Sequence, residues 1–362
     1  MKILFLESDQ IQEYNCSNWR CIMPARALNR AGHQAVVIRT EEWVNRTPNS
    51  VALTEQADIV IFQRNMFMDA MMTIAYWRAK GKVIAVDLDD AYEYMTEETG
   101  SPSYKFWKKN LVEQKQPDGT TKDIEMHPRP LDVLRYGCKL AGAVTSPSKL
   151  IVKDWQPYTR SYWFPNYVDL SLYRRYPNHR EPGQIRIGWG GSMTHLVSWT
   201  ASGANEAMVR IVKEFPNVLL VLLGDPRVER FFADIPPKKR AALGFVPHAI
   251  FATRLSYVDI GLIPLHGEYD RRRSWLKTAE YSVMGIPWIG TDAEPTQEID
   301  TGTRVPNTPD AWYEAIKTYI LNYDAVAGAA QNNMSRAHEF FGIDNHVLDL
   351  IKTFEQIIGD QS

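Results

Sequence analysis

The stretch that decides the fold is DIGLIPLHGEYDRRRSWLKTAEYSVMGIPWIGT, residues 259–291. It predicts an apolar strand over 259–265, a charged loop, a helix over 273–284 and a second apolar strand over 287–291. Strands that are apolar throughout and are joined by a helix are typical of a parallel sheet covered on both faces. The stretch therefore predicts an α/β fold.

The predicted helix carries three charged residues, Arg273, Lys277 and Glu280. Spacings of four and three place them on one face of the helix, while apolar residues occupy another. Two cations and a carboxylate then meet just beyond the carboxyl end of a strand, where open α/β sheets bind ligands. Cations suit a diphosphate, and a carboxylate can accept hydrogen bonds from ribose. A solvated charged face with chance pairing is the alternative.

The same alternation of strand and helix continues on both sides of this stretch. Strands are predicted at 2–6, 35–39, 58–64, 82–90 and 142–148, and in a second series at 185–191, 218–225, 259–265 and 287–291. Helices are predicted at 20–31, 68–80, 131–140, 203–215, 309–334 and 344–358. Between the two series, residues 165–184 contain three prolines and few apolar residues, as linkers do. Two parallel-sheet domains are therefore expected.

The composition indicates a globular protein without an overall positive field. Apolar residues make up 44% and charged residues 23% of the chain, and the formal net charge is -2. This charge argues against electrostatic attraction to nucleic acid or anionic membrane. Cys16, Cys21 and Cys138 lack zinc-type pairing, so we expect reduced thiols and a cytoplasmic protein. The N-terminus has no signal-peptide pattern, and no apolar run reaches the roughly 20 residues of a membrane span.

Residues 96–130 interrupt the alternation with a long, polar, turn-rich segment. Loops of this length are uncommon unless they are functional or disordered. Tyr104 and Trp107 interleave here with lysines, and aromatic rings between cations suit stacking on a sugar or a nucleobase. The alternative is a short amphipathic helix that buries its aromatic rings. On the functional interpretation, Tyr104 and Trp107 are acceptor-side residues.

The glycine-rich run Gly188–Ser192 predicts a phosphate-binding turn. Gly190 and Gly191 let backbone amides approach a phosphate closely, and the Ser192 hydroxyl adds a donor. Many tight turns look alike, but this one opens the domain that also holds the charged helix. His195 follows three residues later and is expected either to reach the same cleft or to cap a helix.

Three aspartates, Asp87, Asp89 and Asp90, end the predicted strand 82–90. Carboxylates at this spacing can hold a divalent metal that bridges a diphosphate. Because a competing phosphate cradle is predicted in the other half, we expect no metal here and interpret Asp89 and Asp90 as acceptor-side or catalytic cleft residues. Capping of the next loop is the alternative. Arg20, after the first strand, is expected to face the cleft or to form a surface salt bridge.

In order and spacing, these motifs resemble those of GT-B glycosyltransferases, and in particular glycosyltransferase family 4. The family's early arginine, proline-alanine helix and G-H turn correspond to Arg20, Pro24, Ala25, Leu28, Gly32 and His33, and its aspartate-rich strand end to VDLDD. Its P-N-x-V-D linker signature corresponds to Pro165, Asn166, Val168 and Asp169. Its I-G-x-x-G-S turn corresponds to Ile187, Gly188, Gly191 and Ser192. The most specific block is the D-I-G-L-x-P-L strand followed by K-x-x-E-Y and G-x-P, here 259–265, Lys277, Glu280, Tyr281, Gly285 and Pro287.

The resemblance implies two Rossmann-like domains that face a cleft, at 1–170 and 171–340, with 341–362 as a helix returning to the first domain. The first domain would bind the acceptor and the second a nucleotide-sugar donor, with UDP- or GDP-sugars expected and no tightly bound cofactor or metal. The oligomeric state stays open. Such enzymes are generally retaining.

The resemblance also assigns roles within the site. Lys277 would contact the diphosphate, Glu280 the ribose, and Arg273 would supply a second cation. Lys277 and Arg273, together with Asp89 and Asp90, are the expected catalytic residues.

One position departs from the family pattern. Many relatives carry two glutamates eight positions apart, and the first of them falls at Arg272 here. In those relatives this carboxylate lies near the donor sugar, and Asp270 or Glu268 would be its substitute. A non-catalytic nucleotide-sugar binding protein is therefore a second hypothesis. For a transferase, the acceptor is a glycan, a small molecule or a hydroxylated base in DNA.

Overall fold

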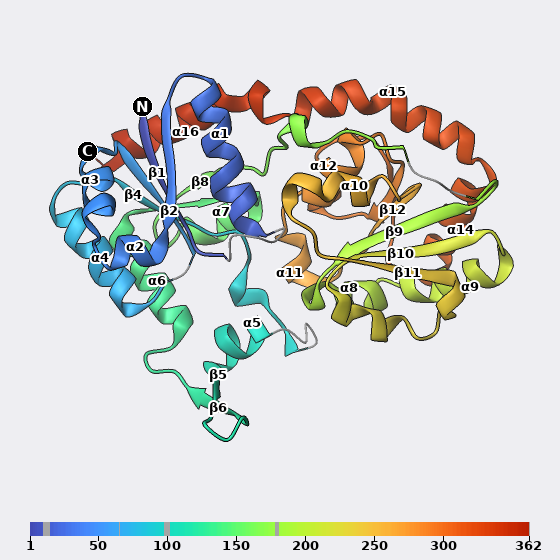
Figure 1. Ribbon diagram of the computed structural model, residues 1–362, viewed down its shortest axis with the longest axis horizontal. Coiled ribbons are helices and arrows are strands. Elements are labelled where there is room, and N and C mark those ends of the chain that lie inside the picture. Colours follow the sequence, from blue (N-terminus) through green and yellow to red (C-terminus); the bar gives the residue numbers. More distant parts are fainter. Residues whose placement is uncertain (10–14, 65, 98–101, 178–180, 362) are drawn as a thin grey trace.

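The chain folds around two parallel sheets, as predicted. The computed structural model describes residues 1–9, 15–64, 66–97, 102–177 and 181–361. Within these residues, each of the two large sheets has six strands, in the orders β2-β1-β3-β4-β7-β8 and β11-β10-β9-β12-β13-β14. Helices cover both faces of each sheet (Figure 1). The predicted pair of Rossmann-like domains is therefore confirmed.

The first sheet belongs to the N-terminal half, and its central strands are buried along their whole length, which explains their unbroken apolar sequences. Its strands are β1 (Lys2–Glu7), β2 (Gln34–Arg39), β3 (Ile59–Gln63), β4 (Ile84–Asp87), β7 (Ala143–Ser146) and β8 (Arg160–Trp163). Its helices are α1 (Met23–Arg30), α2 (Thr40–Val44), α3 (Pro48–Gln56), α4 (Met68–Ala79), α6 (Pro130–Ala141) and α7 (Lys149–Trp155).

The second sheet repeats this arrangement in the C-terminal half. Its strands are β9 (Ile185–Gly191), β10 (Val218–Gly224), β11 (Arg240–Gly244), β12 (Ile260–Ile263), β13 (Trp288–Thr291) and β14 (Thr303–Val305). Its helices are α8 (Leu196–Ala201), α9 (Ala204–Glu214), α10 (Phe251–Leu255), α11 (Gly267–Arg271), α12 (Leu276–Val283), α13 (Glu294–Gln297), α14 (Pro309–Leu321) and α15 (Tyr323–Phe341).

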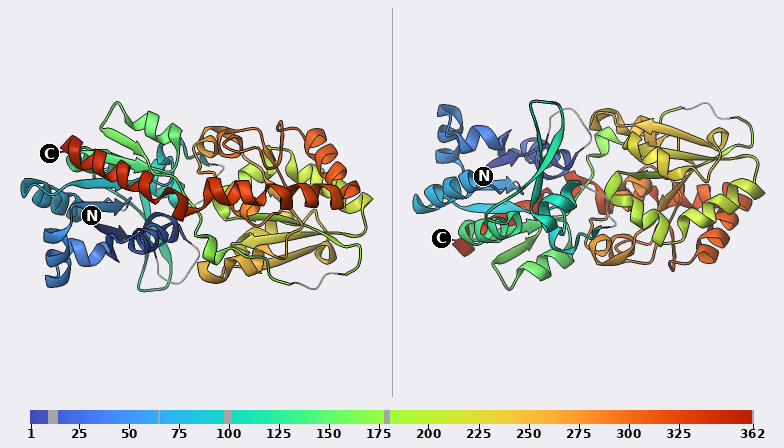
Figure 2. Two further views of the ribbon diagram at one scale, coloured as in Figure 1. Left: turned by 90° about the horizontal axis from the view of Figure 1, so that it is seen from above. Right: turned by 90° about the horizontal axis from the view of Figure 1, so that it is seen from below.

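The last helix, α16 (Val347–Gln361), packs against the first domain. Figure 2 shows α15 and α16 running one after the other across both domains. The ring of Phe354 lies 6.2 Å from that of Phe5 and 5.6 Å from that of Phe164. The Tyr162 hydroxyl also donates to Asp360 at 2.6 Å. In the described part of the chain, no helix has the length and apolar character needed to cross a membrane.

The described part of segment 96–130 contains regular structure, where the sequence suggested either a long polar loop or a short amphipathic helix. The short α5 (Pro102–Tyr104) leads into a π-helical turn, Lys105–Lys109, and then into an antiparallel hairpin of β5 (Leu111–Lys115) and β6 (Thr121–Glu125). The hairpin projects away from the first domain (Figure 1). We call residues 102–125 the insert.

Two local predictions need correction. The helix expected from Arg273 begins at Leu276, because Trp275 and the residues before it are held by other contacts. The Arg273 amide bonds to the Asp270 carbonyl at the end of α11, and the Trp275 indole donates to the Asn166 carbonyl at 2.6 Å. Gly188, Gly190 and Gly191 all lie inside β9 rather than in a turn after it, and a Cβ at Gly188 would come within 2.4 Å of Val258.

Candidate functional site

A cavity of about 310 Å³ lies between the two domains, and we call it the donor cavity. Arg20, Asp89 and Asp90 reach it from the first domain. The second domain supplies every residue expected to bind the donor, namely Gly190, Gly191, Ser192, Arg273, Lys277 and Glu280. The carboxyl ends of β9 and β12 both point at this cavity, so the strand-end rule correctly placed these residues together.

Lys277, in the first turn of α12, brings a cation to the donor cavity. Among the described residues, no hydrogen bond or ion pair engages its ammonium group. Burial, reinforced by the neighbouring Arg273 guanidinium, lowers the pKa of Lys277 to about 7. Because this ammonium group is buried and unpaired, an anion that enters the cavity would stabilise its charged form.

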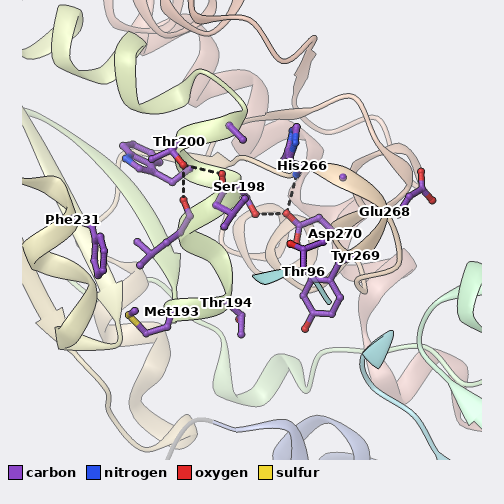
Figure 3. Close-up of a pocket in the computed structure, with 15 residues that line it drawn as sticks. Thr96, Met193, Thr194, Ser198, Thr200, Phe231, His266, Glu268, Tyr269 and Asp270 are labelled. Atoms are coloured by element: carbon purple, nitrogen blue, oxygen red, sulfur yellow. Dashed lines mark hydrogen bonds between the residues drawn. The ribbon is translucent and has the colours of Figure 1, made fainter. Parts of the chain in front are cut away.

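Arg273 is fixed in place by its neighbours. Its Nε donates to Asp270 at 2.6 Å, and its Nη2 donates to the Thr194 carbonyl at 3.3 Å. Asp270 is only 2% exposed and also accepts hydrogen bonds from the Ser198 hydroxyl and the His266 amide. Figure 3 shows the hydrogen bonds from Ser198 and His266 to Asp270 on the wall of a neighbouring cavity. Asp270 therefore acts as the anchor of Arg273.

His195 both caps the turn after β9 and lines the donor cavity. The Ser192 backbone amide donates to His195 Nδ1 at 3.2 Å, so the ring proton resides on Nε2. Burial and the cations Arg273 and Lys277 hold the pKa of His195 well below its ordinary value. The ring is therefore neutral and presents an N–H donor. The sequence offered capping and cleft contact as alternatives, and the structure has both.

Glu280 is a buried carboxylate at the same cavity, only 4% exposed. The Tyr173 hydroxyl donates to it at 2.8 Å and itself accepts from His248 Nε2 at 3.0 Å. Burial lowers the pKa of His248 to about 4, so this ring is neutral too. Tyr173 and His248 were not predicted, because only the tertiary fold brings the linker to α12.

The three aspartates after β4 have different partners. Asp87 is fully buried and pairs with Arg20 through two hydrogen bonds, of 2.8 Å and 2.6 Å. Asp89 pairs with Arg64 and accepts from the Tyr92 hydroxyl at 2.7 Å. Although burial opposes it, Arg64 lowers the pKa of Asp89. Arginine guanidinium groups thus form ion pairs with two of the three carboxylates, those of Asp87 and Asp89. No group of three or more metal-ligating side chains occurs in the described ranges.

Asp90 is the aspartate that faces the neighbouring domain. It lines the donor cavity, and burial raises its pKa against the opposing pull of Arg273. The Asp90 charge in turn supports the protonated form of Lys277. A carboxyl group between two cations and an open cavity suits hydrogen bonding to a substrate hydroxyl.

Arg20 lines the donor cavity, but its guanidinium group is engaged by other residues of the protein. Besides Asp87, it donates to the Phe164 carbonyl at 2.6 Å and to Asn166 Oδ1 at 2.7 Å. It is only 1% exposed. Arg20 thus forms a buried ion pair with the end of β4 and hydrogen bonds to the start of the linker, in place of the surface salt bridge offered as the alternative. A direct acceptor contact by Arg20 stays a prediction.

The aromatic residues of the insert lie near the first domain. Trp107 is 8% exposed and stacks on Tyr92, with ring centroids 4.3 Å apart. Tyr104 is half-buried beside Lys109. Trp107 thus follows the alternative of a short helical segment that buries its aromatic rings. Trp107 also lines a further cavity beside Asp90, while the acceptor contact of Tyr104 stays a prediction.

Arg272, at the position where the sequence resemblance places a glutamate, joins the two domains. Its Nε donates to Asp154 in α7 at 2.6 Å, and its guanidinium lies 3.6 Å from the centre of the Tyr94 ring. Arg272 is absent from the donor-cavity wall. Glu268, one possible substitute for the missing carboxylate, is exposed and pairs with Arg271 at 2.8 Å.

The far end of the donor cavity was not anticipated from the sequence. Leu243, Phe245, Val246 and Phe251 give it an apolar wall, which suits the flat face of a nucleobase. Arg254 also reaches this end, and its buried Nε has no hydrogen-bond partner within the described residues. Residues 243–254 have an ordinary composition, and no motif among them predicted that they would line a cavity.

The fold is shared with solved glycosyltransferase structures, at low sequence identity. Sucrose-phosphate synthase from Thermosynechococcus elongatus is 13% identical, with 99% of each chain covered and a TM-score of 0.62. HepE from Anabaena in complex with UDP is 16% identical, with 98% of this chain and 100% of that chain covered and a TM-score of 0.61.

The catalytic domain of starch synthase IV from Arabidopsis thaliana, bound to ADP and acarbose, is 11% identical, with 99% of each chain covered and a TM-score of 0.63. No family model matches the sequence, and no curated protein matches it. These likenesses confirm the GT-B fold expected from the motifs. A shared fold does not by itself assign the reaction.

Proposed function

We propose that this protein is a glycosyltransferase that moves a sugar from a nucleotide-sugar donor to an acceptor hydroxyl. The observation that carries the proposal is Lys277, whose ammonium group borders a cavity between the domains and makes no hydrogen bond or ion pair within the described chain. Beside it lie the His195 N–H donor and the fixed Arg273 guanidinium. Together these groups suit a diphosphate and the charge that grows on it as it departs.

The same layout supports the division of labour between domains. We assign residues 171–340 to the donor, with the backbone of Gly190 and Gly191 and the Ser192 hydroxyl at the phosphates and Glu280 at the ribose. Residues 1–170 hold the acceptor, and 341–362 bind the two domains together. The UDP and ADP bound to similar folds support a nucleoside diphosphate in this cavity.

We further propose that the enzyme is retaining, like the family it resembles, and works without a bound metal. The pairing of Asp87 with Arg20 and of Asp89 with Arg64 supports metal independence, because these cations already balance the carboxylates. Cys16, Cys21 and Cys138, all within the described residues, form no disulfide, which supports a cytoplasmic location.

The first test is a thermal-shift screen of the full chain with UDP, GDP, ADP, CMP and TDP and their common sugar conjugates, with and without EDTA. We expect stabilisation by UDP or GDP that EDTA leaves intact, and its loss in Lys277→Ala. Lys352→Ala, which removes an exposed lysine on α16, is the matched control. Nucleotide binding that is equal in Lys277→Ala and wild type would exclude this site.

The competing function is binding of a nucleotide sugar without turnover, favoured by the arginine at position 272. Release of nucleoside diphosphate from the preferred donor separates the two. A transferase releases it slowly alone and faster with an acceptor. A binding protein leaves the donor intact with every acceptor, glycan, small molecule or oligonucleotide with a hydroxylated base.

A further inference from the structure

A second cavity, of about 520 Å³, lies beneath the insert, and we call it the insert pocket. The first domain contributes Arg64 and Tyr92, and the second domain contributes Thr194. Most of the remaining wall belongs to the insert, through Ser103, Lys105, Phe106, Trp107, Leu111, Val112 and Glu113. Seen from below, the hairpin lies in front of the first domain, on the side next to the second domain (Figure 2, right).

The insert pocket adjoins the donor cavity. Cys16 and Asp90 line both cavities, so the Asp90 carboxyl group lies where the two meet. Thr194 lines the insert pocket and accepts a hydrogen bond from Arg273 through its carbonyl oxygen, at 3.3 Å. A molecule in the insert pocket would therefore lie next to a sugar held at the donor site.

The walls of the insert pocket combine aromatic surface with polar groups. Tyr92 and Trp107 are stacked at 4.3 Å, and Phe106 meets Trp107 edge-on at 4.8 Å. The ammonium group of Lys105 is held 2.9 Å from Glu113 across the pocket wall. Aromatic side chains of fixed orientation can pack against the C–H face of a sugar ring, and polar groups around them can bond to its hydroxyl groups. The walls of the insert pocket therefore suit a carbohydrate.

The charges of the insert argue for a neutral occupant. Residues 96–130 contain six basic residues (five lysines and Arg129) and six acidic residues, so their formal charges cancel. Lys105 pairs with Glu113 and Asp123, and Lys108 donates to the Glu93 carbonyl at 2.7 Å. To bind a polyanion such as DNA, a protein needs several unpaired cations that contact the phosphates. Residues 96–130 have no excess of positive charge for this purpose.

We propose that the insert pocket is the acceptor subsite and that it takes a neutral carbohydrate whose hydroxyl group reaches the donor cavity at Asp90. This rests on the proposed transferase function. In the transfer, the bond between the anomeric carbon and the diphosphate oxygen breaks, and its electron pair leaves with the nucleoside diphosphate. The acceptor oxygen bonds to the anomeric carbon, and its proton passes to the Asp90 carboxylate.

The test fills the pocket without disturbing the donor site. Val112, on β5, lines the insert pocket and is 39% exposed, so Val112→Trp adds bulk there at small cost to folding. Gln114 lies two residues further along the same face of β5 and outside the pocket wall, so Gln114→Trp is the matched control. Phe106→Leu, a milder change of the aromatic wall, is the second variant.

The probes are the methyl glycosides of glucose, galactose, mannose and N-acetylglucosamine, offered with the donor that passes the nucleotide screen. We expect at least one glycoside to accelerate diphosphate release. Val112→Trp should raise the KM of that glycoside about tenfold or abolish its effect, and Phe106→Leu should raise it by less. The nucleotide Kd of both variants and the KM of Gln114→Trp should match wild type.

Three results would overturn the proposal while leaving the donor site intact. They are an unchanged glycoside KM in Val112→Trp, no response to any glycoside, or turnover only with a duplex oligonucleotide that carries a hydroxymethylated base. If the wild-type chain binds no nucleotide, the proposed function itself fails, so the two failures are distinguishable.

Discussion

Lys277 is the residue whose charge depends most on what fills the donor cavity. Its pKa of about 7 in the empty site arises from burial and from Arg273. A bound diphosphate adds negative charge, which raises that pKa and favours the ammonium form. Proton uptake and nucleotide binding are therefore linked, and each should strengthen the other.

This linkage predicts the pH dependence of binding. Below pH 7 the ammonium is already present, so the nucleotide Kd should be flat there. As pH rises above 7, the empty site loses its proton and the Kd should rise by up to about tenfold per pH unit. Calorimetry between pH 6 and pH 9, in buffers with different ionisation enthalpies, measures both the Kd and the proton uptake.

Lys277→Arg is the control for this prediction, because a guanidinium stays charged throughout that range. Its Kd should lose the pH dependence even if its affinity is lower. The unfolded chain holds the Lys277 proton up to its ordinary pKa near 10.4, so the stability of the empty wild-type protein should instead increase as pH rises above 7. A wild-type Kd that is constant from pH 6 to pH 9 would contradict the titration of Lys277.

Glu280 predicts selectivity for ribose over deoxyribose. One of its carboxylate oxygens accepts from Tyr173, and Tyr173 is held in turn by His248. A buried carboxylate of fixed orientation should accept a hydrogen bond from a ribose hydroxyl, worth about 1.5–3 kcal/mol. We expect UDP to bind at least tenfold more tightly than 2′-deoxy-UDP, or GDP than 2′-deoxy-GDP. Glu280→Gln should reduce that ratio, while the exposed control Glu355→Gln should preserve it.

At the scale of elements, two neighbouring glycines end paired strands but differ in their surroundings. Gly224 in β10 pairs with Gly244 in β11. Gly224 has φ +111, and a Cβ there would lie 2.8 Å from the Gly191 carbonyl oxygen. Gly244 has an ordinary backbone conformation and open space around it. Gly224 therefore lets β10 pack closely against the end of β9, within the predicted phosphate-binding segment Gly188–Ser192.

Gly224→Ala should destabilise the protein by about 1–3 kcal/mol, because the alanine must accept both a left-handed backbone and a backbone contact. It should also weaken nucleotide binding by displacing Gly191. Gly244→Ala should change the free energy of unfolding by less than about 0.5 kcal/mol. Chemical denaturation of both variants, followed by nucleotide titration, measures these effects. Equal destabilisation by the two alanines would contradict the role of Gly224.

Most central strands were predictable because burial on both faces requires unbroken apolar sequence. The strands that escaped prediction from the two large sheets are β8, β11 and β14, and each lies at the edge of its sheet. Edge strands bury less of their surface, so RSYW or RAALG reads like a loop. The insert hairpin escaped for the same reason, since its two strands are exposed along almost their whole length.

The site was predictable where a single element determines it. Lys277 and Glu280 lie on α12 as periodicity predicted, and Arg273, just before that helix, lines the same cavity because it is close in sequence. The partners of Glu280, Arg20 and Asp89 come from positions tens of residues away, and no local pattern specifies them. The sequence therefore identified the charged residues of the site, but it did not predict which of them form ion pairs with each other.

At the scale of the whole molecule, the relation between the two domains depends on a few side chains. Arg272 is largely buried and joins Asp154 and Tyr94 of the first domain, whereas another interdomain pair, Lys149 with Glu298, is more exposed. Buried pairs with a stacked guanidinium resist separation more than exposed pairs do. Arg272 should therefore stabilise the closed arrangement in which the donor cavity exists.

Replacing Arg272 tests this directly. Arg272→Ala should lower stability by about 1–3 kcal/mol and increase the radius of gyration of the nucleotide-free protein in small-angle X-ray scattering. Arg272→Glu, which introduces the carboxylate that the sequence resemblance predicts at this position, should open the domains further, because it would face Asp154 and Glu268 with like charge. Lys149→Ala should leave both quantities near wild type. If Arg272→Glu instead kept the domains closed and accelerated donor turnover, position 272 would act in sugar recognition, and the interdomain role assigned to Arg272 would be wrong.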